Sequence, residues 1–490
     1  MNQIAKRIIP GWGLVVFLVL AGAAVRWWNL GKASIWHDEG FSIMMAQLPL
    51  SEILERTARD VHPPLYYMAL HYWISVFGSS EVAVRSLSMV ATLLIIPLTY
   101  CLVRRLWNER GAQLAAVFVC FGPMLVRYGQ EARMYGLMAF LVLLTVYFLV
   151  RAMERNQARW WIGFSLSLAA AMYTHYYSVF IIPAVLVYVT LNTNRQKQSG
   201  WWNPRWWLSS LGALLLFAPW LPSAYGQVTR QKYFDWIPSA DAATLPNTLL
   251  QFLAYGYPPT LSMAIKLAIG GMFIGLMVLA WKAAGRQRTN LLVFGVYALA
   301  GPVLVYAASL SGSPYLERYF IYAAVGFYIL LALMITTLGR RSQLAVAIYV
   351  LVLFGVGSYN IHTQYTHDMR SAAAYIQQQY QPGDYLLSDV LLTYFDFSYY
   401  NQTGAPAHVW QEGGVNGYGE SSLIYTKADE VVVRRLETIQ PASGRVWLIS
   451  KLDKQGSVAK VPVHWTAAGP KRIFGDNAVQ QYLMAPRGQK

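Results

Sequence analysis

The chain has 490 residues, of which 56% are hydrophobic, 14% aromatic and only 13% charged. This composition excludes a soluble protein of that length, and repeated long apolar runs indicate a polytopic α-helical membrane protein. The formal net charge of +16 would suit nucleic acid, but residues 1–360 carry 27 Lys and Arg against 12 Asp and Glu, whereas residues 361–490 carry 12 against 11. The positive excess therefore belongs to the membrane part, where it reports topology, and no nucleic-acid partner is expected.

Apolar segments long enough to cross a bilayer predict about eleven spans. They lie at residues 11–28, 82–103, 111–127, 134–150, 160–175, 177–191, 206–222, 260–281, 290–310, 319–338 and 343–359. Every second connection carries a basic cluster, and these clusters together hold sixteen Lys and Arg beside only two Glu. Basic loops mark the cytoplasmic side, so we expect the N-terminus inside and an uncleaved first span.

The apolar segment at residues 63–77 is too short to span, because fifteen residues of helix cover about 22 Å of a core that is roughly 30 Å thick. Counting it as a span would also place the basic clusters outside. We therefore predict a surface helix within an external loop at residues 29–81. Two further short helices, at 41–48 and 51–60, are expected there, the second with Ser51 as its N-cap.

Residues 361–490 change to the composition of a small globular α/β domain, which the topology places outside the cytoplasm, after a membrane domain at residues 1–360. The sequence predicts helices at residues 369–380 and 428–439 and strands at residues 385–390 and 446–449.

The external loop collects ionisable groups where a membrane protein has little reason to place them. Asp38 and Glu39 follow the first span, and Asp60 and His62 precede the surface helix. Two prolines after His62 restrict the backbone and would aim its side chain. A solvated loop is the simpler interpretation. The functional one is a general base, or ligands of a divalent cation, at the mouth of an intramembrane cavity.

Other external segments carry charged and aromatic side chains beside the spans. The candidates in them are Glu131, Arg133, His175, Lys232, Arg318 and Tyr319. Surface ion pairing, snorkelling of Arg to lipid headgroups and an interfacial aromatic belt are the alternatives to a binding site. The sequence contains no Walker-type phosphate loop, HExxH or GxSxG motif, so nucleotide-driven transport and metalloprotease chemistry have no support.

At these residues the chain resembles the GT-C superfamily of polyprenyl-phosphate-sugar glycosyltransferases, in the branch of protein O-mannosyltransferases and the lipid A aminoarabinose transferase. The matching segments are Asp38-Glu39 and residues 60–65, 80–85, 130–133 and 314–319. His62 stands where the aminoarabinose transferases have Lys, and Tyr66-Tyr67 replace the Gly-Lys that continues the motif of the O-mannosyltransferases. The resemblance therefore implies neither a lipid A nor a protein acceptor in particular.

The resemblance implies a mannosyltransferase-like enzyme of the cell envelope, multi-pass in the inner (plasma) membrane, that takes a sugar from a polyprenyl-phosphate donor at the external face. The acceptor would be a lipid, a glycan or a protein. By motif match Asp38 is the catalytic base, with Glu39 beside it as a second catalytic candidate. We expect His62, Arg133, Lys232, Arg318 and Tyr319 to bind the donor phosphate, and Asp60, Glu131 and His175 to support them or to hold a divalent cation.

No cofactor is certain from the sequence. A transporter or flippase of lipid-linked sugars, which would use the same cavity without breaking a bond, is the alternative function. A scaffold whose residues 361–490 bind envelope partners is a third interpretation.

Overall fold

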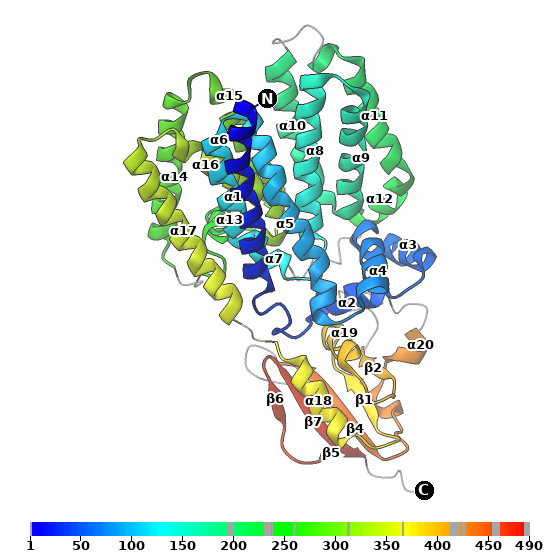
Figure 1. Cartoon of the computed structure of the whole chain (residues 1–490). Helices are drawn as coiled ribbons and strands as arrows, with labels where there is room; N and C mark the ends of the chain where they lie inside the picture. The colour runs from blue at the N-terminus through cyan, green and yellow to red at the C-terminus, as the bar shows by residue number, and fades with distance from the viewer. Residues whose placement is uncertain are drawn as a thin grey trace, which may run out of the picture.

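The computed structural model describes residues 2–193, 200–229, 237, 239–257, 261–310, 314–364, 367–411, 422–423, 428–452 and 461–484. Only the backbone is described for residues 2–10, 228 and 428–429. Long helices form a bundle, and a mixed sheet with its own helices lies beyond one end of that bundle (Figure 1).

The bundle is built from helices that overlap the predicted apolar segments. They are α1 (Asn2–Trp27), α5 (Glu81–Leu106), α6 (Glu109–Phe121), α7 (Pro123–Gly129), α8 (Tyr135–Arg155), α9 (Ala158–Thr174), α10 (Ile182–Thr193), α11 (Pro204–Phe217), α12 (Leu221–Thr229), α14 (Met263–Ala283), α15 (Arg288–Ser309), α16 (Ile321–Thr336) and α17 (Arg340–Thr363). A shorter helix, α13 (Thr244–Leu253), precedes α14.

Eight helices among the described residues are long and apolar enough to cross a membrane, or nine if α6 and α7 form one span bent by 47°. Helix α9 and the described apolar part of α1, Gly11–Trp27, are shorter, with 17 residues each. The prediction of a polytopic helical membrane protein is thus confirmed. The number of spans and their orientation stay predictions.

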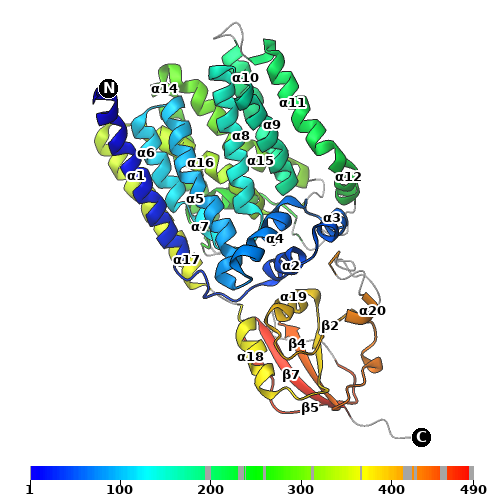
Figure 2. The same ribbon diagram turned by 45° about the vertical axis from the view of Figure 1, so that its right-hand side comes forward.

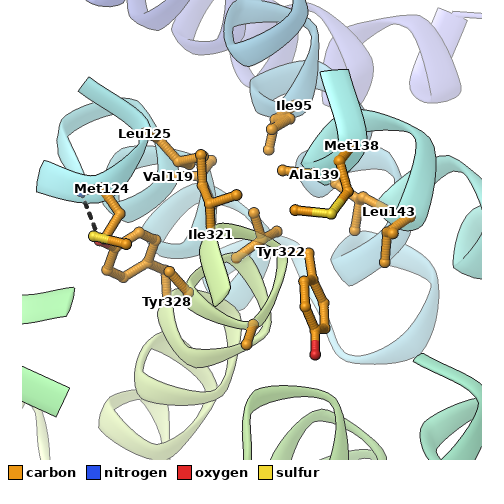
Figure 3. Close-up of a cluster of buried hydrophobic side chains, with 14 of the residues drawn as sticks. Ile95, Val119, Met124, Leu125, Met138, Ala139, Leu143, Ile321, Tyr322 and Tyr328 are labelled. Atoms are coloured by element: carbon orange, nitrogen blue, oxygen red, sulfur yellow. Dashed lines mark hydrogen bonds between the residues drawn. The ribbon is translucent and has the colours of Figure 1, made fainter. Parts of the chain in front are cut away.

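Helix α16 lies in the middle of the bundle. Its residues Ile321–Ile335 are all buried, which matches a helix that is hydrophobic on every side. Figure 3 shows part of the surrounding core, where Ile321 and Tyr322 meet side chains of α5, α6, α7 and α8. The hydroxyl oxygen of Tyr328 accepts a hydrogen bond from the backbone N–H of Met124 at 3.3 Å. Because α16 is held on all sides, the segment at its N-terminal end is positioned by the core.

The loop after α1 forms short helices that lie across one end of the bundle (Figure 2). They are α2 (His37–Ala46), α3 (Leu50–Ala58) and α4 (Leu65–Phe77). Helix α4 has 13 residues, so the prediction of a short helix in place of a span is confirmed. The prediction of Ser51 as an N-cap is wrong, because α3 begins at Leu50 with Pro49 in the capping position.

The described residues of the C-terminal part form a seven-stranded sheet in the order β3-β2-β1-β4-β7-β5, with β6 paired to β7. Its strands are β1 (Tyr385–Ser388), β2 (Ala407–Trp410), β3 (Val432–Val433), β4 (Arg445–Lys451), β5 (Trp465–Ala467), β6 (Arg472–Phe474) and β7 (Asn477–Met484). Strands β3, β2, β1 and β4 run parallel, and β7 is antiparallel to its three neighbours.

Three helices in the described ranges accompany the sheet, namely α18 (Met369–Gln379), α19 (Leu391–Tyr400) and α20 (Ala428–Val431). The predicted helix over residues 428–439 is wrong beyond α20, because the next residues form β3 and a 3₁₀ turn at Leu436–Thr438. Three consecutive valines, 431–433, explain the change, since β-branched side chains favour a strand and β2 offers an edge to pair with.

The sheet region is docked on the loop at residues 29–81 through helix α19. Gly40 of α2 lies so close to α19 that an added Cβ would be 2.7 Å from the carbonyl oxygen of Phe395. The guanidinium of Arg370 pairs with the carboxylate of Glu81 at 2.5 Å, and the Tyr399 hydroxyl donates to the Ser79 carbonyl at 2.8 Å. The sheet therefore lies at the same end of the bundle as α2, α3 and α4.

His367, at the start of the sheet region, supplies a testable pH dependence. Its Nε2 lies 2.9 Å from Asp396 and its Nδ1 lies 2.9 Å from Asp476, which Lys451 also contacts at 2.5 Å. Burial alone would lower the pKa of His367, but the two carboxylates outweigh it and raise the pKa to about 9. Since the ordinary His pKa is about 6.5, the charged imidazole contributes stability that is complete below pH 6.5 and is lost as the pH rises through 9.

We expect the thermal unfolding temperature of the purified chain to fall between pH 7 and pH 10, with a loss of about 2–3 kcal/mol from this group. In His367→Gln the fall should be smaller over the same range. An identical pH profile in both proteins would show that the imidazole does not carry the effect.

Candidate active site

Asp38 is held between two guanidinium groups from distant parts of the chain. Its Oδ2 accepts a hydrogen bond from Nη1 of Arg318 at 3.1 Å and lies 3.9 Å from Nε of Arg133. Arg133 follows α7, whereas Arg318 belongs to the 3₁₀ turn Glu317–Phe320 before α16. The Asp38 side chain is 21% exposed, so it remains reachable. Three sequence-predicted residues thus meet at one point.

The charge of Asp38 is controlled by this pairing. Burial would raise the pKa of the carboxyl, but the coulombic effects of Arg133 and Arg318 outweigh burial and hold the pKa below its usual value. His37, with Nε2 3.8 Å from the same carboxylate, has its pKa lowered to about 4, chiefly by burial. At neutral pH the site therefore holds an ionised Asp38 next to an uncharged imidazole and two cations.

Arg133 is oriented by α2 as well as by the carboxylate. Its Nη1 donates to the backbone carbonyl of Asp38 at 3.2 Å and to the hydroxyl of Ser42 at 3.0 Å. Arg318 lies against aromatic rings, with its guanidinium carbon 5.8 Å from the centroids of Trp36 and Tyr319. These contacts direct the guanidinium groups of Arg133 and Arg318 toward one position, as bidentate recognition of a phosphate requires.

An aromatic wall stands beside the two arginines. The ring of His175 lies 5.2 Å from His62 and 4.7 Å from Tyr319 between centroids. His62 and His175 are buried, and burial lowers the pKa of each, that of His175 to about 3. Both imidazoles are therefore neutral at pH 7 and would meet a phosphate as hydrogen-bonding groups, not as cations.

Glu39 points away from Asp38 and is completely enclosed. Its two carboxylate oxygens accept from Nε and Nη2 of Arg85 at 2.8 and 2.6 Å, and the backbone N–H of Ala132 donates to it at 2.8 Å. Arg85 also donates to backbone carbonyls of the α1–α2 connection, including that of Leu30 at 2.7 Å. The structure therefore places Glu39 in a buried clamp that holds α2, α5 and the turn before α8.

Glu131 and Asp60 are two carboxyl groups near the site whose pKa values are raised. The carboxylate oxygens of Glu131 are buried and make no hydrogen bond among the described residues, although Arg127 Nη2 lies 3.9 Å away. Burial is the main reason that the pKa of Glu131 is raised and that of Asp60 reaches about 6. No group of three or more His, Cys, Asp and Glu gathers within the described ranges, so we assign no set of metal ligands.

Two cavities lie next to this arrangement. The first, of about 290 Å³, lies between the bundle and the sheet region, and its lining includes His37, Arg127 and Lys451. The second, of about 230 Å³, is lined in part by Arg127, Glu131 and Arg318. Trp36, Arg127 and Tyr255 line both.

The sequence missed several of these groups as site residues. Trp36 and His37 directly precede Asp38, and Arg85 ends the matching segment 80–85, so the sequence held a signal for these three. Arg127, which lines the second cavity, and Tyr135, whose ring lies 6.0 Å from the guanidinium of Arg318, reach the site through packing alone. Lys232 lies outside the described residues.

The known proteins most informative for this chain share its architecture. The model of the family described as dolichyl-phosphate-mannose-protein mannosyltransferase matches residues 61–222. The crystal structure of ArnT from Cupriavidus metallidurans in the apo state superposes with a TM-score of 0.64 at 15% identity, covering 98% of this chain and 100% of that chain. The same protein bound to undecaprenyl phosphate gives a TM-score of 0.61 at 13% identity, covering 96% of this chain and 99% of that chain.

A more distant solved structure has the same fold. The oligosaccharyltransferase AglB from Archaeoglobus fulgidus, in complex with an inhibitory peptide and a dolichol-phosphate, gives a TM-score of 0.54 at 10% identity over 92% of this chain and 70% of that chain. No protein with curated annotation matches by sequence.

The family model covers about a third of the chain and the solved structures share its fold, so the chain is similar to the GT-C superfamily of membrane glycosyltransferases. Within that class it is similar to enzymes that use lipid-linked sugar donors, as its sequence motifs predicted.

Proposed function

We propose that this protein transfers a sugar from a polyprenyl-phosphate donor to a hydroxyl or amine acceptor at the external face of the membrane, with Asp38 as the base. The observation that carries the proposal is the carboxylate of Asp38 lying between the guanidinium groups of Arg133 and Arg318. A base beside two phosphate-binding cations is the arrangement that attack on a phosphate-linked anomeric carbon needs.

In the proposed step Asp38 takes the proton of the acceptor while the acceptor oxygen or nitrogen bonds to the anomeric carbon. The bond from that carbon to the phosphate oxygen breaks, and its electron pair leaves with the lipid phosphate. Arg133 and Arg318 then share the charge that develops on the phosphate. Binding of the phosphate would draw both guanidinium groups away from Asp38 and so increase its basicity at the moment of reaction.

The other predicted residues receive supporting roles. His62, His175 and Tyr319 would line the donor site as neutral groups beside the phosphate. Glu39 would act as a positioning residue through Arg85, since both of its oxygens are already bonded. Asp60 and Glu131 would tune the charge around the two arginines.

The lipid-phosphate donor is supported by the relatives, because ArnT of C. metallidurans binds undecaprenyl phosphate and AglB of A. fulgidus binds dolichol-phosphate. The external face is supported by the positive-inside pattern, which places the end with α2 and the sheet opposite the basic clusters. We propose the inner (plasma) membrane as the location, with an acceptor in the cell envelope. A divalent cation remains a proposal that chelation with EDTA tests.

The function is tested by mass spectrometry of envelope glycolipids and glycoproteins from a deletion strain and from the same strain carrying the wild-type chain. We expect one class of envelope molecule to lose a mass equal to one sugar residue in the deletion strain and to regain it on complementation. If the lipid-linked sugar instead only changes its side of the membrane, with no acceptor altered, the flippase alternative is correct.

A further inference from the structure

Helices α14 and α15 are joined by the short turn Gly285–Gln287, yet an apolar groove of about 620 Å³ lies between them. Helix α16 closes its inner side with Leu330 and Met334, which are buried. The outer walls are different, because Val278 of α14 and Val303 of α15 are 46% and 47% exposed. The groove is therefore open toward the outside of the bundle, where a membrane protein meets lipid.

Small side chains on α15 keep this groove open. Gly295 and Ala300 both line it, and a Cβ added at Gly295 would have no heavy atom within 4 Å. Among the described residues of the lining, only Lys282 is charged. An open apolar hollow of this kind suits a hydrocarbon chain, which would supply the contacts that its walls lack.

Three cations gather at the end of the groove where α14 passes into α15. Lys282 lines the groove, Arg286 belongs to the turn, and Arg288 is the first residue of α15; all three are exposed. Nε of Arg288 donates to the carbonyl of Trp281 at 2.7 Å, and its Nη2 donates to that of Lys282 at 3.3 Å. These bonds hold the guanidinium of Arg288 at the mouth of the groove.

The three cations have no acidic partners in the described part of the chain, where no Asp or Glu forms an ion pair with Lys282, Arg286 or Arg288. By contrast, Arg104 near the end of α5 pairs with Glu109 at 2.9 Å. The positive charge at the mouth of the groove therefore remains available to an anion. Basic sites beside membrane-spanning helices bind the phosphates of lipid headgroups in this way.

The mouth lies at the end of the bundle opposite the sheet. Helix α5 begins at Glu81, which pairs with Arg370 of the sheet region, and it ends at Leu106. Gln287, in the turn at the mouth, donates from its side-chain amide to the carbonyl of Trp107 at 3.3 Å, directly after α5. The mouth and the candidate active site are thus at opposite ends of the bundle, and the positive-inside pattern predicts the cytoplasmic leaflet for the mouth.

The depth of the groove matches one leaflet. From Leu291 to Val303 it follows α15 for about 18 Å. Half of a hydrocarbon core that is roughly 30 Å thick is close to this depth. An acyl chain of a phospholipid in that leaflet would fill the groove, whereas a polyprenyl chain is much longer and would leave most of its length outside.

We propose that this groove binds an anionic glycerophospholipid, with one acyl chain between α14 and α15 and the phosphate at Lys282, Arg286 and Arg288. Binding there requires no sugar transfer, so it is independent of the proposed function. A lipid that binds only the folded chain also stabilises it, by an amount that grows with the lipid concentration.

The test uses the purified full chain in neutral detergent micelles. The anionic probe is dioleoyl phosphatidylglycerol, and dioleoyl phosphatidylcholine is the zwitterionic probe with the same acyl chains. Native mass spectrometry measures the lipid retained by the protein, and the unfolding temperature is recorded along the same titration. One variant, Lys282→Gln with Arg286→Gln, removes two charges at the mouth. The other, Gly295→Phe, fills the groove.

Each variant has a matched control. Arg110→Gln with Arg155→Gln removes two exposed cations at the same end of the bundle, away from the groove. Gly355→Phe adds the same ring on the exposed side of α17, where an added Cβ likewise has no heavy atom within 4 Å. Both controls should bind the anionic lipid as the wild-type chain does.

We expect the wild-type chain to bind phosphatidylglycerol about tenfold more tightly than phosphatidylcholine, and each groove variant to lose about tenfold in affinity for phosphatidylglycerol. Equal binding of the two lipids, or unchanged binding in either variant, would overturn the proposal. Displacement of phosphatidylglycerol by a lower concentration of undecaprenyl phosphate would also overturn it, because the groove would then hold a polyprenyl lipid. The charge variant changes only exposed side chains, so it decides the question even if Gly295→Phe does not fold.

Discussion

Asp38→Asn is expected to lower the rate of sugar transfer by about 100- to 10,000-fold, the usual contribution of a well-placed general base. Asn has the same shape and can still accept a hydrogen bond from Arg318, but it cannot take a proton from the acceptor. The measurement is transfer by the purified variant at saturating donor, with donor binding measured separately. Donor binding should persist or tighten, because the variant removes a carboxylate that competes with the phosphate for Arg133 and Arg318.

The matched control for this variant is Asp241→Asn, an exposed acid whose carboxylate contacts only its own turn in the described contacts. It should transfer at the wild-type rate. Retention of more than a third of wild-type transfer by Asp38→Asn would remove Asp38 from the role of base. The unbonded carboxylate of Glu131 would then be the next candidate to examine.

The second large effect is expected at the buried pair of Glu39 and Arg85, whose side chains are only 1% and 3% exposed. Removing one member, as in Glu39→Gln or Arg85→Met, leaves the other charged and buried, which typically costs about 3–5 kcal/mol. We expect a large fall in the unfolding temperature and in the yield of folded protein. The double variant should recover part of the loss, because the two changes act on one interaction.

The exposed pair Glu55 and Arg59 of the α3 region provides the comparison, since its charges lie 3.5 Å apart with more than half of each side chain in solvent. Glu55→Gln should change stability by less than about 1 kcal/mol. If Glu39→Gln instead unfolded at the wild-type temperature but lost transfer, Glu39 would be a catalytic residue and not a positioning one.

The helical bundle could be predicted from the sequence because its signals are local. Each apolar segment is long enough to identify a helix by itself, and the length of α4 together with the placement of Lys and Arg separated it from the spans. The limits of this reasoning appear at β3, where Val432 and Val433 form a strand within a predicted helix. A neighbouring strand decided that conformation, and a single window of sequence does not contain the neighbour.

The candidate site, like the fold, was predicted from the sequence only in part. The sequence by itself determined which segments are candidates for the site, because charges beside membrane spans are costly, and it indicated Asp38, Arg133 and Arg318 before any contact was known. Only the tertiary structure decided that these three meet while the adjacent Glu39 turns into a buried clamp with Arg85. Successive side chains on a helix point in different directions, so neighbours in the chain enter different environments, and residues 280 positions apart, such as Asp38 and Arg318, enter the same one.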